Sequence, residues 1–193
     1  MPGEPMLPAI FEEIDREELN CFLVACHHRM GPVRRPSRGW SHGLRAGGRL
    51  VAVAATDTLI RERVAGFPRR DAIELSRLCA DRPDLCRVVL RLWRAFVFPA
   101  VAELRGCRWA ISYQDAVLHR GDLYRFDGWI RVGTSRSGPD SRTGRLGRRK
   151  VIWGWNDDRD ERRRRSLGLP KAPREFGITI DGGRAFSSSI GNV

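Results

Sequence analysis

Four polar side chains in the central part of the chain have the chemistry of a transfer reaction: Glu74, Ser112, Asp115 and Tyr124. Asp115 follows an apolar segment and could accept a hydrogen bond from an exocyclic amine or act as a general base. Its alternative role is to cap the following helix. Glu74 is a second candidate base, with a buried Glu–Arg pair as the alternative. Ser112 could orient a substrate or an attacking amine.

The neighbours of Glu74 limit how it can be used. Alternate residues of a strand point to opposite faces, so Glu74 and Ser76 share one face and Arg77 points to the other. All three could line one pocket only if a β-bulge interrupts the strand. His28 and His119 are further acid–base candidates because histidine titrates near neutrality. Packing or surface exposure is the alternative for each histidine.

The elements that must position these residues follow one another between Asp71 and Gly133. Residue periodicity and Pro83, which marks a helix start, predict strand, helix, strand, short helix and strand. The expected ranges are 71–80, 83–104, 109–113, 121–124 and 129–133. A helix that joins two strands favours a parallel pair with a right-handed crossover, and ligands of such sheets lie beyond the carboxyl ends of the strands.

The flanking segments have their own patterns. Apolar residues recur at helical spacing over 11–26, and a Gly-Gly turn between two strand-like runs predicts a β-hairpin over 41–57. Residues 150–155 are expected to form a strand after a loop over 134–149. We therefore expect a single domain over 1–155. Residues 156–193 should form a charged segment, which is a solvated helix or coil, and then a disordered tail.

Composition indicates a globular protein. The chain has 193 residues, 41% of them hydrophobic, and a net charge of +12. No apolar run approaches the ~18 residues of a membrane span, and the first residues lack the pattern of a secretory signal. Five cysteines without a Cys-x-x-Cys pair are typical of reduced thiols. We expect a soluble cytoplasmic protein without a membrane partner.

Cys26, His27 and His28 are residue types that bind metals, but adjacent residues of an extended chain point to opposite faces. Burial or packing of these side chains is the preferred interpretation, and no metal is expected. Sequence alone leaves a metal site open as the alternative.

Two arginine-rich segments, over 34–40 and 131–155, contain tryptophans and favour nucleic acid as a partner. Charge that binds phosphate together with surfaces on which bases stack suits such a ligand. The alternative is that the arginines reflect a GC-rich genome and that Trp153 and Trp155 belong to the core. The candidate DNA-binding residues are Arg34, Arg35, Arg38, Arg142, Arg145, Arg148, Arg149 and Lys150.

The predicted order of helix, hairpin, strand, helix, strand, helix and strand resembles the GNAT acyltransferase fold, an α/β fold with a mixed central sheet flanked by helices. Within this fold, five segments resemble a phage-associated GNAT-like group that includes the Mom-type DNA adenine modification (antirestriction) proteins. They are Cys26-His-His-Arg29, Gly47-Gly-Arg-Leu-Val-Ala-Val-Ala54, Glu74-Leu-Ser-Arg-Leu-Cys-Ala-Asp81, Ser112-Tyr-Gln-Asp115 and His119-Arg-Gly-Asp-Leu-Tyr124. The resemblance extends from about Cys26 to Trp155. Leu118 and Asp122 depart from the Mom-type pattern.

The resemblance implies that the protein modifies an adenine amino group of DNA with a carbamoylmethyl or other small acyl-derived group and so protects phage DNA from restriction. Tyr124 would protonate a departing thiolate, Asp115 and Ser112 would position the amine, and Glu74 would assist proton removal. A place in the core is the alternative for Tyr124. If it is phage-encoded, the protein would act in the host cytoplasm. The base would be flipped out of the duplex or met unpaired. An ordinary GNAT N-acetyltransferase of a small amine or protein and a non-catalytic DNA-binding module are the alternatives.

Acetyl-coenzyme A is the first candidate donor. Ordinary GNAT enzymes hold its diphosphate on a glycine-rich loop at a helix N-terminus, but residues 81–87 contain no glycine. The candidate cofactor-binding residues are Leu78, Cys79, Arg82 and Arg87. The arginines could hold a diphosphate, although Asp81 and Asp84 oppose it.

Overall fold

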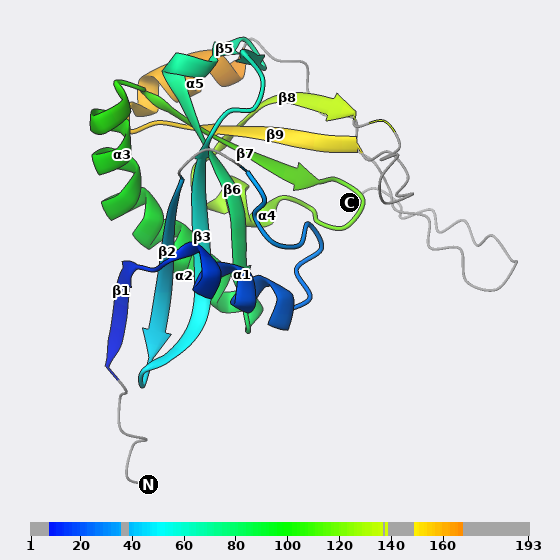
Figure 1. Cartoon of the computed structure of the whole chain (residues 1–193). Helices are drawn as coiled ribbons and strands as arrows, with labels where there is room; N and C mark the ends of the chain where they lie inside the picture. The colour runs from blue at the N-terminus through cyan, green and yellow to red at the C-terminus, as the bar shows by residue number, and fades with distance from the viewer. Residues whose placement is uncertain (1–7, 36–38, 137, 139–148, 168–193) are drawn as a thin grey trace, which may run out of the picture.

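The computed structural model describes residues 8–35, 39–136, 138 and 149–167 (Figure 1). The strands are β1 (Ala9–Glu13), β2 (Trp40–Ala46), β3 (Arg49–Thr58), β4 (Arg63–Val64), β5 (Phe67–Pro68), β6 (Ala72–Ala80), β7 (Trp109–Asp115), β8 (Ile130–Arg136) and β9 (Arg149–Trp155). The α-helices are α1 (Arg16–Ala25), α2 (Pro83–Leu92), α3 (Phe98–Arg105), α4 (Asp122–Phe126) and α5 (Arg159–Leu167), with a 3-10 turn at Arg69–Asp71 and a π-helical turn at Trp93–Val97.

Seven of the strands form one mixed sheet in the order β1-β2-β3-β6-β7-β9-β8. β6 and β7 pair in parallel, and the other described neighbours of this sheet are antiparallel. β4 and β5 form a separate small hairpin. The predicted hairpin between Ser41 and Asp57 and the predicted parallel pair are therefore confirmed.

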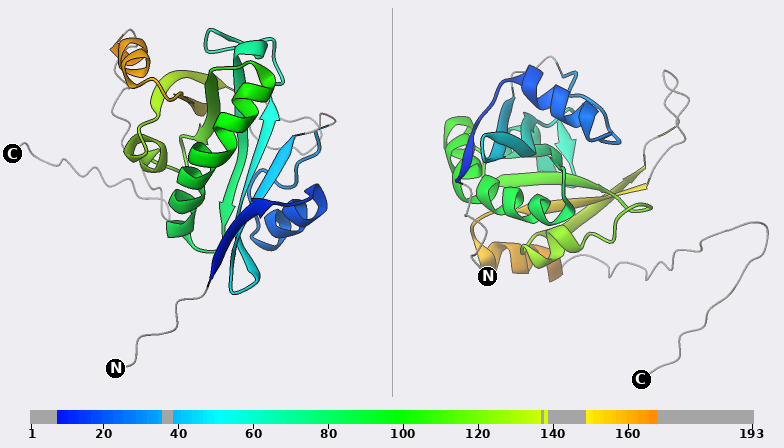
Figure 2. Two further views of the ribbon diagram at one scale, coloured as in Figure 1. Left: turned by 90° about the vertical axis from the view of Figure 1, so that its left-hand side faces the viewer. Right: turned by 90° about the horizontal axis from the view of Figure 1, so that it is seen from below.

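The sheet has a helical layer on each face (Figure 2). Alternate residues of β3 belong to different cores: Ala52 and Ala54 pack with α2 and α3, whereas Val53 and Ala55 pack with α1. This alternation follows from the period of two in a strand. A third cluster lies under the β4–β5 hairpin and includes Trp109.

Two predictions about helices were wrong. Phe11 lies in β1, opposite Leu44 of β2, and α1 begins only at Arg16, where the Asp15 side chain accepts a hydrogen bond from the Glu18 backbone N–H. The long helix predicted to reach Leu104 is interrupted by the π-helical turn. Pro99 has no backbone N–H for the usual bond to the carbonyl four residues earlier, which accounts for a change of helical hydrogen bonding at this point.

The charged run after β9 is helix α5, and two of its arginines pack inward. Arg165 lies over the Phe67 ring at 3.7 Å, and Arg162 over the Trp155 ring at 5.4 Å. Arg108, directly before β7, pairs with Glu161 of α5 at 2.9 Å. The tail expected to be disordered, from Asp181, lies outside the described residues. No described helix is long and apolar enough to cross a membrane.

Candidate active site

The neighbouring strands β6 and β7 are paired at their first residues and diverge towards their carboxyl ends. We call the two diverging ends, residues 76–80 of β6 and 113–115 of β7, the fork. Their pairing runs only from Ala72 opposite Trp109 to Leu75 opposite Ser112. β6 then continues to Ala80 and β7 to Asp115 in a different direction (Figure 1). Among the described residues, no strand pairs with this edge of β6 beyond Leu75. The fork therefore offers backbone groups to an extended ligand.

A pair of buried hydroxyls stands at the base of the fork. The Ser112 hydroxyl donates to the Leu75 carbonyl at 3.0 Å, at the last paired position of the two strands. The Ser112 and Tyr124 oxygens are 2.8 Å apart. Because the single Ser112 proton is used on Leu75, the Tyr124 hydroxyl donates to Ser112. The structure thus brings together two of the predicted catalytic residues.

The surroundings of Tyr124 keep its hydroxyl protonated. Its ring stacks on Trp153 at 5.6 Å and meets Trp129 edge to face at 5.3 Å. Burial raises the pKa of Tyr124 to about 12, and the Ser112 hydrogen bond offsets only part of this shift. The hydroxyl can therefore donate a proton or a hydrogen bond throughout the neutral range.

The loop between β7 and α4 is fixed by Gln114, which the sequence did not single out. Its side-chain oxygen accepts from the Trp153 indole at 2.6 Å, and its amide donates to the His119 carbonyl. Gly121 has φ +80°, and a Cβ there would stand 2.5 Å from the Gln114 oxygen. Glycine is required at this position because both its backbone conformation and its close approach exclude a side chain.

Asp127 fixes the far end of α4. Its carboxylate is 3.0 Å from the Arg94 guanidinium and accepts from the Trp129 indole at 3.3 Å. Burial nevertheless raises the pKa of Asp127, with Arg94 opposing the shift. Neither Gln114 nor Asp127 carries a motif by which sequence could identify it, since Gln114 bonds Trp153 and Asp127 pairs with Arg94, both distant along the chain.

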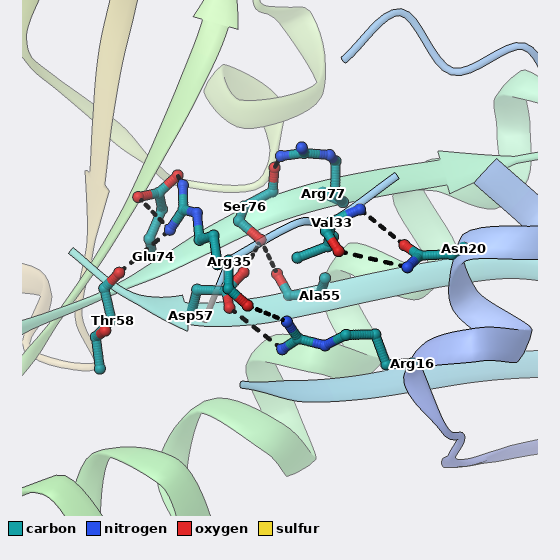
Figure 3. A network of polar contacts seen from close by, with 10 residues as sticks. All are labelled: Arg16, Asn20, Val33, Arg35, Ala55, Asp57, Thr58, Glu74, Ser76 and Arg77. Carbon is teal, nitrogen blue, oxygen red and sulfur yellow. Dashed lines mark hydrogen bonds and ion pairs between the residues drawn. The ribbon is translucent and has the colours of Figure 1, made fainter. Parts of the chain in front are cut away.

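A β-bulge at Ser76 changes which face of β6 its residues occupy. Ala55 of β3 pairs with Arg77 and Thr56 with Leu75, which leaves Ser76 as the extra residue. Leu75 and Leu78 accordingly both face the α2 side. The bulge that sequence left as a condition is present, and Glu74, Ser76 and Arg77 all face the α1 side (Figure 3).

Glu74 lies in a buried ion pair, the alternative that sequence left open. Arg35 donates to both of its oxygens, at 2.6 and 3.0 Å, and also to the Thr58 carbonyl at 3.2 Å. The side chains are 16% exposed for Arg35 and 4% for Glu74. Arg35 thus serves the protein interior rather than a DNA surface, which corrects its assignment as a DNA contact, and the Glu74 carboxylate is occupied.

A second buried carboxylate lies beside this pair. The Ser76 hydroxyl donates to Asp57 at 2.5 Å, and the Arg16 guanidinium is 3.7 Å from the other Asp57 oxygen (Figure 3). Asn20 of α1 bonds both backbone groups of Val33 and ties the loop after α1 to this face. The network connects α1, that loop, β3 and β6.

The helix cap that sequence left as the alternative for Asp115 is not present, since Gly121 precedes α4 and no side chain caps that helix. The Asp115 carboxylate accepts from the Val117 backbone N–H at 3.1 Å, and the Asp115 carbonyl accepts from Leu118 and His119. The side chain caps the turn that leaves β7, which is compatible with a place at the fork. His119 is exposed in the same loop.

The start of α2 is poorly equipped to hold a diphosphate. The Arg82 guanidinium is bound to Asp84 at 2.6 Å. Arg82 is the N-cap residue of α2, and its side chain makes no capping hydrogen bond to the helix. Arg49 pairs with Asp81 at 2.8 Å. Arg87 is exposed on the first turns of α2. A coenzyme A diphosphate would have to displace Asp84 from Arg82, because a guanidinium cannot satisfy both anions with the same N–H groups.

The candidate cofactor residues of β6 lie on the fork itself. The Leu78 side chain packs in the core between the sheet and helices α2 and α3, and the Cys79 side chain packs in the core beside α1. Only their backbone groups can therefore face a ligand at the unpaired edge of β6. Burial raises the pKa of the Cys79 thiol to about 12, and the Cys26 thiol adds to the shift. Cys79 is therefore an inert packing residue.

The remaining basic candidates are only partly described. Arg34 is exposed, Arg149 and Lys150 begin β9, and Lys150 lies 5.7 Å from the Tyr113 ring. Arg38, Arg142, Arg145 and Arg148 lie outside the described residues. Trp153 and Trp155 are 9% and 7% exposed, so they are core residues and offer no stacking surface.

Metal ligands do not gather in the part of the chain that the structure describes. No group of three or more His, Cys, Asp or Glu side chains there could hold an ion. His27 has φ +48°, so the Cys26-His27-His28 segment is a helix end rather than an extended chain.

Comparison with known proteins identifies the fold. An N-acetyltransferase from Staphylococcus aureus Mu50 superposes with a TM-score of 0.54 at 12% identity, over 77% of this chain and 98% of that one. The aminoglycoside 6'-N-acetyltransferase from Enterococcus faecium gives 0.51 at 12% identity, over 76% and 96%. The ribosomal-protein-S18-alanine N-acetyltransferase from Escherichia coli gives 0.50 at 18%, over 77% and 94%.

The chain has the GNAT fold. The mixed seven-stranded sheet with helices on both faces and these superpositions support the fold predicted from the sequence. No family model and no curated protein matches the sequence. Nothing among the similar structures singles out the Mom-type group.

Proposed function

We propose that this protein is an acyltransferase that uses an acyl-coenzyme A donor and an amine acceptor. The observation that carries the proposal is the buried Tyr124–Ser112 hydroxyl pair at the base of the fork. The free edge of β6 beyond Leu75 fits the amide-containing arm of coenzyme A, because its unpaired backbone groups can bond amides as a neighbouring strand would. A bound coenzyme A thioester would supply the activated acyl group.

Tyr124 supplies a hydrogen bond to the departing sulfur in this scheme. With a pKa of about 12, it holds its proton more firmly than a thiol with a reference pKa near ~8.5. Donation of a hydrogen bond to developing negative charge is therefore favoured over complete proton transfer. Rotation of the hydroxyl away from Ser112 redirects the proton, and Ser112 remains bonded to Leu75.

The acceptor that we propose is the adenine amino group of DNA, modified with a small acyl-derived group, as the resemblance of the Ser112–Tyr124 region to the Mom-type proteins implies. The net charge of +12 and the basic residues around β9 support a polyanionic partner. Asp115 stands at the end of β7, where it can accept a hydrogen bond from an incoming amine and take its proton as the C–N bond forms and the C–S bond to coenzyme A breaks.

An ordinary N-acetyltransferase of a small amine or a protein is the second candidate. Two of the similar structures are named for their acceptors, an aminoglycoside and an alanine of a ribosomal protein, and neither name mentions DNA. This candidate shares the fork and the hydroxyl pair and differs only in the acceptor.

Two measurements test the proposal. Acetyl-coenzyme A should raise the melting temperature, because a ligand that binds only the folded state stabilises it by about 2.7 kcal/mol at 100 times its dissociation constant. Absence of a shift at millimolar ligand would argue against this donor. Tyr124→Phe should lower transfer by about 100-fold, the usual scale for a positioned acid, while Tyr113→Phe should not.

The acceptor is tested on DNA. Nucleosides from cells that express the protein should contain a modified adenosine by mass spectrometry, and Tyr124→Phe should lower its fraction by about 100-fold. Replacing Arg142, Arg145, Arg148, Arg149 and Lys150 by Ser should flatten the dependence of DNA affinity on salt, whose slope is roughly −0.9 per neutralised phosphate. Unmodified DNA together with acetylation of a small amine would support the second candidate. DNA binding unaffected by Tyr124→Phe, with no transfer to any amine, would support a non-catalytic binding module.

A further inference from the structure

The Gln114 amide is buried, and both of its polar atoms are hydrogen-bonded. Its oxygen accepts from the Trp153 indole at 2.6 Å, its nitrogen donates to the His119 carbonyl, and the residue is 6% exposed. An indole only donates and a backbone carbonyl only accepts, so a single orientation of the amide satisfies both neighbours. The side chain therefore ties β9 to the loop that leaves β7.

The register of the sheet places Gln114 beside the hydroxyl pair. Ser112 and Gln114 are alternate residues of β7 and share one face, and Trp153 of β9 lies opposite Ser112. The Ser112 hydroxyl is 2.8 Å from the Tyr124 oxygen, and Trp153 stacks on the Tyr124 ring with 19° between the two planes. Tyr124 is thus held at its oxygen by Ser112 and along its ring by Trp153.

The loop bonded to Gln114 leads directly into the helix that carries Tyr124. Gly121 follows His119 by two residues, and its carbonyl accepts from the Tyr124 backbone N–H at 3.1 Å in the first turn of α4. A Cβ on Gly121 would stand 2.5 Å from the Gln114 oxygen and 2.7 Å from the Trp153 ring, so the loop packs directly on both side chains. Gln114 therefore contacts both supports of Tyr124, the ring that stacks on it and the backbone that precedes it.

We propose that Gln114 is a positioning residue for acyl transfer, which holds the Tyr124 hydroxyl where it can donate to the departing sulfur. A hydrogen bond weakens steeply when its geometry departs from the preferred range, so a small movement of the Tyr124 ring would lower the rate. Gln114 acts through Trp153 and the loop rather than on the substrate. The proposal rests on the proposed function, in which Tyr124 supplies that hydrogen bond.

Gln114→Glu tests the role most directly, because it keeps the shape of the side chain and removes one donor. The ionised carboxylate can accept from Trp153, but it cannot donate to the His119 carbonyl and would repel it. At about pH 8 the variant should have a kcat about tenfold lower than the unaltered protein, with an unchanged KM for the acyl donor. The ratio of the two rates should recover as the pH falls, because the protonated carboxyl group regains a donor and burial raises its pKa above the reference of about 4.3.

Asn20→Asp is the matched control. Asn20 also joins a backbone N–H and a backbone carbonyl, both of Val33, and it lies on α1, which packs on the face of the sheet opposite to Tyr124. The same exchange of amide for carboxylate should leave kcat and its pH dependence as in the unaltered protein. A lower melting temperature in both variants, with a lower kcat only in Gln114→Glu, separates positioning from stability.

Tyr124 reports its own surroundings without any transfer reaction. The chain has two tyrosines, so in a Tyr113→Phe background the absorbance change of phenol ionisation comes from Tyr124 alone. Burial raises the pKa of Tyr124 to about 12. Gln114→Ala removes both hydrogen bonds and makes room for water, so the pKa should fall towards the reference of about 10. At about pH 11 the folded variant, checked by circular dichroism, should contain more tyrosinate than its Tyr113→Phe parent.

The outcomes separate this inference from the proposed function. Full activity of Gln114→Glu at about pH 8, or an unchanged Tyr124 titration in Gln114→Ala, would overturn the positioning role even if acyl transfer is observed. If the unaltered protein transfers no acyl group, the proposed function fails, and the titration alone decides whether Gln114 holds Tyr124. Trp153→Phe keeps a stacked ring without the indole N–H and should lower kcat in the same direction, which keeps the test valid if a Gln114 variant does not fold.

Discussion

Replacing Glu74 by Gln should destabilise the protein strongly, because it removes the charge that compensates Arg35. Arg35 makes two hydrogen bonds to Glu74 and one to the Thr58 carbonyl, in a site where its side chain is 16% exposed. Removing one partner of a buried ion pair costs about 3–5 kcal/mol, since the other charge remains in the interior. The partial exposure of Arg35 and its bond to Thr58 place the expected loss near the lower value, about 3 kcal/mol.

The loss is measured by urea denaturation followed by tryptophan fluorescence. With a denaturant slope of about 2 kcal/mol per molar urea, the midpoint should fall by roughly 1.5 M. Asp84→Asn makes the same chemical change in the exposed pair with Arg82 and should leave the midpoint unchanged. The double variant Arg35→Met, Glu74→Leu should be more stable than Glu74→Gln, because it leaves no charge unpaired.

An unchanged midpoint for Glu74→Gln would refute this reasoning. It would mean that Arg35 finds water or another acceptor without cost, and Glu74 would again be available as a base. The activity of the same variant separates the two roles. If Glu74 has a structural role, the Glu74→Gln protein loses stability. If Glu74 is catalytic, the variant stays fully folded and its turnover falls.

Three further predictions concern other parts of the structure. Burial raises the pKa of both Tyr113 and Tyr124 to about 12, so tyrosinate absorbance should stay low in the native protein at pH 10–11 and rise on unfolding. Since the folded state holds these protons more firmly, stability should fall as pH increases from about 10 towards 12. Gly121→Ala should lower the melting temperature more than Gly128→Ala, because both glycines have φ near +80° but only Gly121 lacks space for a Cβ. The expected loss of folding free energy is about 1 kcal/mol at Gly128 and at least twice that at Gly121. Arg165→Ala should cost about 1 kcal/mol in chemical denaturation through loss of its contact with Phe67, whereas an exposed arginine of α5 should be replaceable without effect.

Local sequence patterns determined most of the architecture. The Gly-Gly turn marked the hairpin of β2 and β3, Pro83 marked the start of α2, and the helix between two strands indicated a parallel pair. These signals depend on backbone preferences and on the burial of alternate residues, which act over a few positions of the chain. They also placed Ser112 and Tyr124 on consecutive elements.

Tertiary structure alone decided which charges meet. The partner of Glu74 is Arg35, thirty-nine positions away, and the bulge that turns Arg77 to the same face is visible only in the register of β6 against β3. A strand pattern predicts strict alternation, and one inserted residue reverses it for every later position. The physical reason is that charge compensation in a protein interior is settled by contacts between distant segments, whereas helices, turns and strands are largely specified by their own residues.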